Sequence, residues 1–141
     1  MEKEEKGMIK FQEMTEAQIL DRLLQAADED LPTTTVSIKR LNIPIKLKAV
    51  NETTLDQLRK RCTIKDGKTE TFDEEQYGYL VMVAGTVSPN WGDAKLLEKY
   101  KASGPEQVVR RILLPGEAIQ VSDVILDLSG YGEDAVQEVK N

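Results

Sequence analysis

The first regular pattern of apolar positions in the chain begins at residue 15. Apolar side chains recur at the spacing of one helical face, and they are Ile19, Leu20, Leu23, Leu24 and Ala27. Thr15 stands before them with Gln18 three positions later, which is the arrangement of a capping box. The pattern predicts an amphipathic helix. Pro32 restricts the residue before it, so the segment 31–35 is predicted to be an extended linker behind this helix.

A different pattern follows between residues 36 and 50, where apolar and polar residues alternate. In the second half of this segment one face collects apolar side chains and the other collects lysines. The apolar side chains are Ile43, Ile45, Leu47 and Ala49, and the lysines are Lys46 and Lys48. Val36 and Ile38 alternate in the same way in the first half, and Asn42 lies in the turn between. The segment predicts a two-stranded hairpin, which needs a surface to pack on because an isolated hairpin is marginal.

From residue 51 to residue 130 the apolar spacing is helical. Five helix starts are predicted by capping residues or by proline at the first helical position: Asn51 or Thr54, Asp73, Asp93, Pro105 and Pro115. The segment 73–87 is the most apolar and is predicted to be the central helix, while 65–68 predicts a turn. Gly130 and Gly132 end the last helix. The predicted fold class is α+β, with a small β-hairpin packed on a mainly α-helical bundle.

These patterns divide the chain into four parts. Residues 1–14 have no apolar period and are expected to be a flexible N-terminus. Residues 15–35 hold the amphipathic helix and its linker, and residues 36–130 form the domain of hairpin and bundle. Residues 131–141 are expected to be a C-terminal tail.

The composition excludes several kinds of chemistry. The 141 residues include no histidine and one cysteine, so histidine-based triads, Cys-His dyads, histidine-ligated metals and an internal disulfide are all impossible. Cys62 has Arg61 beside it, which lowers a thiol pKa, but it shares a helical stripe with Leu55 and Leu58. A buried structural thiol is the favoured interpretation. We expect no enzyme activity, no catalytic residue, no cofactor and no metal site.

The chain also lacks the marks of secretion or membrane insertion. No apolar run approaches the length of a membrane-spanning helix, and the first residues carry charges of both signs in place of an apolar signal segment. We therefore expect a protein of a reducing cytoplasm that has no membrane partner.

The net charge of −6 conceals a strong segregation. Residues 36–68 hold nine basic and three acidic side chains, whereas residues 1–30 hold four basic and nine acidic ones. Residues 71–141 are acidic again, with six basic and twelve acidic side chains. The basic segment has three interpretations: a nucleic-acid footprint, a solvated sheet face, or a contact with an acidic segment of the same chain or of a second copy. It contains no aromatic residue on which a base stacks, which favours the solvated face.

Two features are candidates for binding a partner protein. Pro89 and Trp91 lie together in a loop, where the indole either anchors a partner or folds back as a plug under the bundle. The stripe of the N-terminal helix either packs on the core or docks in a groove of another chain. The candidate contact residues are Ile19, Leu20, Leu23, Leu24, Pro89 and Trp91.

The order of several segments resembles a known family. The segments are 40–48, 86–91, 96–100, 113–117 and 128–131, and the most specific are Ser88-Pro89-Asn90-Trp91 and Leu113-Leu114-Pro115-Gly116-Glu117. Together they resemble the XkdN-like phage tail assembly chaperones over roughly residues 10–141.

The resemblance implies a non-enzymatic role in virion morphogenesis, in the bacterial host cytoplasm, for a phage, a prophage or a tail-derived particle. Such chaperones are thought to bind the tape measure protein and keep it soluble until the tail tube protein polymerises around it, and to be absent from the mature virion. A homo-oligomer is a further possible partner, and no nucleic acid is expected. The alternative is a nucleic-acid-binding regulator that uses the basic segment 36–68, and a weaker one is a structural tail component.

Related families also make a longer form of the protein by ribosomal frameshifting. Lys140-Asn141 can be encoded by the slippery sequence that this process needs. A frameshifted longer form is therefore another expected partner, and the codons at the end of the gene test this hypothesis.

Overall fold

The computed structural model describes residues 13–26 and 31–139. The chain divides into two units, residues 1–30 with 136–141 and residues 31–135, and each is described here by itself. The predicted flexible N-terminus lies almost wholly outside the described residues, and so do Ala27 and the Lys140-Asn141 pair.

Helix α2 (Glu16–Gln25) is the main element described in the first unit. It begins at the predicted capping box: Gln18 N donates to Thr15 Oγ1 at 3.2 Å, and Thr15 N donates to Gln18 Oε1 at 2.9 Å. These two bonds satisfy amide groups that the first turn of a helix otherwise leaves without partners. The predicted amphipathic helix is confirmed.

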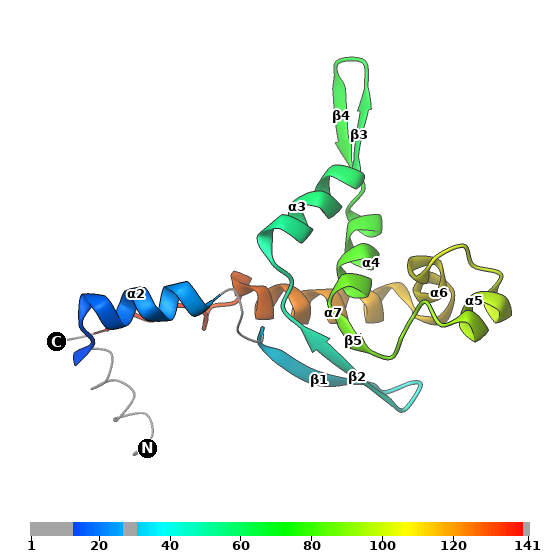
Figure 1. The fold of residues 1–141 in the computed structure, drawn as a ribbon. Helices are drawn as coiled ribbons and strands as arrows, with labels where there is room; N and C mark the ends of the chain where they lie inside the picture. The colour runs from blue at the N-terminus through cyan, green and yellow to red at the C-terminus, as the bar shows by residue number, and fades with distance from the viewer. Residues whose placement is uncertain (1–12, 27–30, 140–141) are drawn as a thin grey trace. The chain divides into compact units, whose positions relative to one another are not determined.

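The second unit contains a three-stranded antiparallel sheet in the order β1 (Thr33–Ile38), β2 (Ile43–Lys48) and β5 (Thr86–Ser88) (Figure 1). The predicted hairpin is its first two strands, paired with Val36 opposite Ile45. The predicted alternation is confirmed in β2, whose apolar side chains at positions 45 and 47 are buried and whose lysines are exposed. Asn42 turns the chain with a φ of 53°.

Two boundaries differ from those predicted. Strand β1 begins at Thr33, so the linker expected over 31–35 is shorter. The predicted central helix ends at Ala84, and the residues after Gly85 form β5 beside β2. The Thr86 hydroxyl donates to the carbonyl of Met82, which satisfies an acceptor at the helix end and allows the chain to leave as a strand.

Five α-helices follow β2 in the described part of this unit, and the predicted starts are confirmed. They are α3 (Glu52–Arg61), α4 (Glu74–Ala84), α5 (Ala94–Tyr100), α6 (Pro105–Ile112) and α7 (Pro115–Leu126). Asn51, Asp73 and Asp93 are side-chain caps, and the two prolines occupy first turns. A π-helical turn, η2 (Asp127–Tyr131), follows α7 and contains Gly130 with a φ of 99°.

A second hairpin, of β3 (Thr63–Asp66) and β4 (Thr69–Phe72), was not predicted. Only its turn was expected, over 65–68. Every residue of β4 is exposed, so the strand has no buried face to produce an apolar alternation in the sequence. Gly67 has a φ of 62°, which suits the first position of a two-residue hairpin turn. The hairpin extends away from the helices of this unit (Figure 1).

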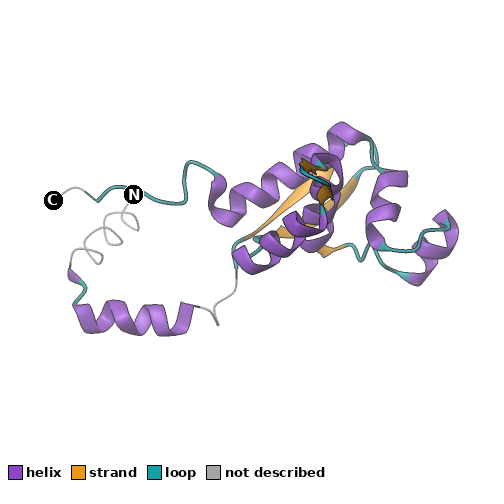
Figure 2. Cartoon of the chain, turned by 90° about the horizontal axis from the view of Figure 1, so that it is seen from above, coloured by secondary structure: helices purple, strands orange, loops and turns teal. Residues whose placement is uncertain are grey.

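The core of the second unit lies between the inner face of the three-stranded sheet and the helices above it. Figure 2 shows these helices overlying the strands. The largest fully buried side chains come from the sheet and from α3, α4, α6 and α7, and include Ile45, Leu47, Leu55, Met82, Val108 and Ile125. The α+β fold class is confirmed. No helix among the described residues is long and apolar enough to cross a membrane.

Candidate functional site

Helix α2 presents the four large apolar side chains of its stripe to solvent. The exposed fractions rise from 40% at Ile19 to 79% at Leu24, and no residue of the helix is buried. Burying one such side chain stabilises an interface by about 1.5–3 kcal/mol. All four predicted contact residues on this helix are thus exposed on one face. Their role in binding stays a prediction.

Trp91 folds back under the bundle and is not exposed to a partner. Its side chain is 4% exposed, and its Nε1 donates to Thr86 Oγ1 at 3.2 Å. The indole is therefore the plug of the bundle, and the candidate contact role of Trp91 is corrected, because a buried ring offers a partner no surface. Pro89 is half-buried in the same loop, and its contact role stays a prediction.

A groove between α4 and α7 was not predicted. It encloses about 690 Å³ and lies wholly within the second unit. Small side chains make its floor: a Cβ atom added to Gly78 would lie 3.8 Å from Ser122 Oγ, and Ala118 is buried beside them. Since small residues let two helix backbones approach closely, the larger side chains around them stand up as walls.

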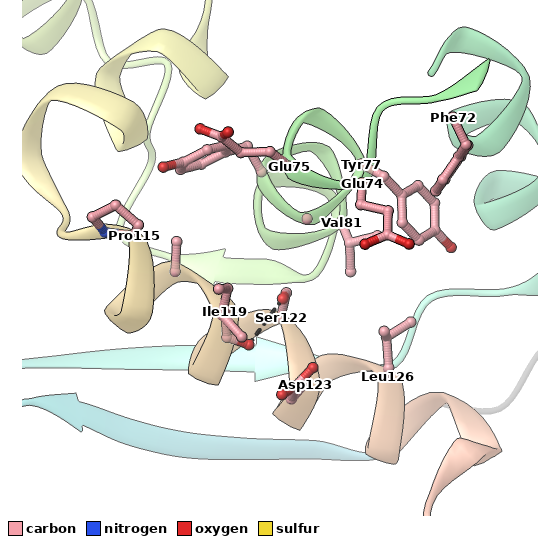
Figure 3. Close-up of a pocket in the computed structure, with 13 residues that line it drawn as sticks. Phe72, Glu74, Glu75, Tyr77, Val81, Pro115, Ile119, Ser122, Asp123 and Leu126 are labelled. Atoms are coloured by element: carbon pink, nitrogen blue, oxygen red, sulfur yellow. Dashed lines mark hydrogen bonds between the residues drawn. The ribbon is translucent and has the colours of Figure 1, made fainter. Parts of the chain in front are cut away.

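The walls of this groove are apolar. Phe72 and Tyr77 stand together at one end with ring centroids 5.4 Å apart, and Ile119 and Leu126 project from α7 (Figure 3). Ile119 is 60% exposed although it is a large aliphatic residue. An exposed apolar groove of this kind is typical of a surface that binds another molecule.

The rim of the groove is acidic. Glu74, Glu75 and Asp123 line it, and among the described residues no lysine or arginine does. Glu75 is paired with Arg110, whose Nη1 lies 3.2 Å from Glu75 Oε1 and whose guanidinium stacks 4.3 Å from the centre of the Tyr79 ring. No ion pair within the described residues reaches Glu74 or Asp123. The rim therefore has a net negative charge.

Comparison with known proteins supplies the family. The model of the phage XkdN-like tail assembly chaperone proteins matches residues 20–140, nearly the whole chain. The chain belongs to this family. The resemblance noted in the sequence is confirmed.

Two relatives in Bacillus subtilis strain 168 are similar to this tail assembly chaperone over most of its length. The phage-like element PBSX protein XkdN is 27% identical over 108 residues, which is 70% of this chain and 73% of XkdN. The uncharacterized protein YqbN is 28% identical over 98 residues, which is 65% of this chain and 66% of YqbN.

The fold also matches a solved structure. The crystal structure of the protein YqbN superimposes with a TM-score of 0.57 at 22% sequence identity, covering 73% of this chain and 88% of that one. At this identity the likeness shows a shared fold.

The basic segment of the chaperone is partly neutralised within the chain. Arg40 is paired with Glu117 at 2.8 Å, and Lys60 with Asp56 at 3.1 Å. Glu117 belongs to the acidic segment 71–141. Arg40 therefore contacts an acidic segment of the same chain, which was the third interpretation of the basic segment. The lysines of β2 are exposed on its outer side, as the interpretation of a solvated sheet face predicts.

Cys62 is a structural thiol, as the sequence favoured. The side chain is buried among the core residues. Burial raises the pKa of the thiol, and the nearby charge of Asp73 raises the pKa further, while Arg61 lowers it less. A protonated, buried thiol is a weak nucleophile.

Sequence reasoning missed the groove because no single motif marks it. The signal was present in two places: small residues recur at Gly78, Ala118 and Ser122, and Ile119 stands outside the apolar stripe of its own helix. An apolar residue on an otherwise polar helix face is the kind of signal that locates such a surface.

Proposed function

We propose that this chaperone binds the tape measure protein and keeps it soluble while the tail tube assembles. Family membership supports the assembly role, and one observation carries the finer proposal. The apolar face of α2, formed by Ile19, Leu20, Leu23 and Leu24, is exposed along its whole length. An amphipathic helix with an uncovered stripe is suited to docking against an apolar helical client.

The physical argument concerns aggregation. The client that the family resemblance implies, the tape measure protein, is long, helical and prone to aggregate before the tail tube forms around it. An exposed apolar surface of that kind associates with itself. A small protein that covers part of the surface removes it from water. Its net charge of −6 adds repulsion between the coated clients.

Release is as important as binding. Many copies that each bind with moderate affinity hold a long client firmly, and each copy is displaced singly as tube subunits arrive. The proposal therefore places the protein in the host cytoplasm during assembly, with the tail tube protein as its competitor, and outside the mature virion. It requires binding and no catalysis.

Co-purification tests this proposal. Tagged wild-type chain is co-expressed with the tape measure protein encoded in the same genome and is then purified in buffer of near-physiological salt. The same is done with the double variant Leu20→Ser/Leu24→Ser and with the control Asp21→Asn/Gln25→Ser, which changes the polar face of the same helix. We expect wild type and control to retain the client and the stripe variant to retain at least tenfold less. Circular dichroism establishes that all three chains are equally folded.

Two outcomes contradict the proposal. One is that no tape measure protein co-purifies with wild type. The other is that nucleic acid co-purifies in its place and is lost as salt rises, which is the behaviour of the nucleic-acid-binding alternative.

A further inference from the structure

We infer that the groove between α4 and α7 is a second docking site, and that it binds an amphipathic partner helix carrying lysine or arginine beside its apolar stripe. The inference deepens the proposed function. It rests on that function in one respect, which is that the partner helix belongs to the tape measure protein. The site itself is separate from the stripe of α2.

The shape of the groove fits a helix. Residues of α7 line it along the full length of that helix at helical spacing, and they are Pro115, Ala118, Ile119, Ser122, Asp123 and Leu126. Twelve residues of α-helix extend about 18 Å, or about three turns. A partner helix lying along this length places apolar residues from three successive turns against the groove.

The depth of the groove comes from its small central residues. Gly78 and Ser122 face each other at the floor. Tyr77 and Ile119 rise on opposite sides (Figure 3). An incoming leucine or isoleucine side chain therefore enters between two apolar walls, above a floor beneath which Val81 is fully buried.

Charge selects the partner. Glu74 lies on the α4 side of the groove and Asp123 on the α7 side, so the apolar strip has a carboxylate on each side (Figure 3). Basic residues that flank the stripe of a docked helix meet these carboxylates, and acidic flanks are repelled by them.

The same charges disfavour helix α2 of a second copy of this chain as the occupant. The ionisable residues within α2 are Glu16, Asp21 and Arg22, so the helix has a net negative charge. Placing it in the groove opposes like charges at the rim. A partner of opposite charge is therefore the better fit.

Three synthetic peptides test the inference against the whole chain. Two share one 18-residue frame with leucines at three successive turns, and one has lysines beside the stripe where the other has glutamates. The third is residues 13–30 of this chain. Fluorescence anisotropy of labelled peptide measures each dissociation constant at two salt concentrations. We expect the lysine peptide to bind at least tenfold more tightly than the other two, with a smaller preference at high salt.

Variants of the full chain locate the binding site. Ile119→Ser removes a wall and is expected to weaken binding of the lysine peptide about tenfold, while Gln120→Ser, the neighbouring exposed position, leaves it unchanged. Glu74→Gln/Asp123→Asn keeps the apolar groove and is expected to abolish most of the preference for lysine over glutamate. All four substituted positions are exposed, and thermal unfolding followed by circular dichroism verifies that each variant is folded.

The inference is overturned if the lysine and glutamate peptides bind equally well, or if Ile119→Ser leaves binding unchanged. Tightest binding of the 13–30 peptide also overturns it, because the occupant is then a second copy. Failure here is distinguishable from failure of the proposed function. If only the groove inference fails, the α2 stripe still captures the tape measure protein. If only the proposed function fails, the lysine peptide still binds in the groove but the tape measure protein is not captured.

Discussion

Arg40 and Glu117 form a two-pronged ion pair that joins the sheet to the bundle. Arg40 Nε donates to Glu117 Oε2 at 3.1 Å, and Arg40 Nη2 donates to Glu117 Oε1 at 2.8 Å. The same Nη2 donates to the carbonyl of Ile112 at 2.8 Å, and Glu117 Oε1 accepts from Leu114 N at 2.8 Å. The Arg40 guanidinium thus ties the turn after β1 to the end of α6, and the Glu117 carboxylate ties that turn to the start of α7.

The pair predicts a pH dependence of stability. The hydrogen bond from Arg40, then that from Leu114, holds the pKa of Glu117 below its usual range. A carboxyl whose pKa is lowered by folding stabilises the protein fully above its unfolded pKa of about 4.3, and that contribution disappears as the pH falls through the lower folded pKa. Denaturant unfolding from pH 7 to pH 3 should show a shallower acid loss of stability for Glu117→Gln than for wild type. Equal slopes would show that this carboxyl contributes nothing to acid stability.

Two glycines next to α7 predict opposite effects of the same substitution. A Cβ atom on Gly78 meets Ser122 Oγ at 3.8 Å, an ordinary contact, whereas a Cβ atom on Gly85 lies 2.5 Å from Ile125 Cγ2. Gly78→Ala is therefore expected to raise the free energy of unfolding by about 0.5–1 kcal/mol, because alanine favours the helix. Gly85→Ala is expected to lower it by about 1–3 kcal/mol through overpacking. Denaturant unfolding measures both effects. If Gly78→Ala also destabilises the protein, the prediction that only Gly85 lies too close to its neighbour for a Cβ atom is wrong.

Trp91 is expected to matter for stability and not for client binding. Trp91→Ala removes a buried indole and should cost about 3–5 kcal/mol, whereas Trp91→Phe keeps most of the packing and loses the hydrogen bond to Thr86, which contributes about 0.5–1.5 kcal/mol. The fluorescence of this single tryptophan should shift to longer wavelength on unfolding. If a folded Trp91→Phe variant no longer bound the tape measure protein, Trp91 would be a contact residue and this prediction would be wrong.

Cys62 is expected to resist modification in the folded protein. Its thiol is buried and its pKa is raised, so a thiol reagent at pH 7–8 should react with it far more slowly than with the denatured chain. The rate should rise with denaturant in parallel with unfolding. Fast reaction of the native chain would mean that the cysteine is accessible.

The elements with strong local signals could be predicted from the sequence. Thr15 and Gln18 predict one helix start, and the alternation of apolar and lysine residues predicts β2, because capping and strand burial depend on a few adjacent side chains. The strand after Gly85 could not be predicted in this way. It pairs with β2 about forty residues earlier, and the apolar spacing on either side of the glycine is continuous.

Of the candidate surfaces, one could be predicted from local sequence and one depends on how the helices pack. The stripe of α2 could be predicted because it lies within one helix. The groove could not, since it depends on which faces of α4 and α7 meet, and the local pattern of neither helix decides that. Trp91 had two open interpretations because burial of a loop residue depends on the whole bundle.

The solubility of the tape measure protein tests the central claim most directly. The client is expressed alone, with wild-type chain, with Leu20→Ser/Leu24→Ser and with Asp21→Asn/Gln25→Ser, and its soluble fraction is measured after lysis and centrifugation. The account predicts that the client is mostly insoluble alone and with the stripe variant, and mostly soluble with wild type and with the polar-face control. A client that stays insoluble beside well-expressed, folded wild-type chain would contradict the account.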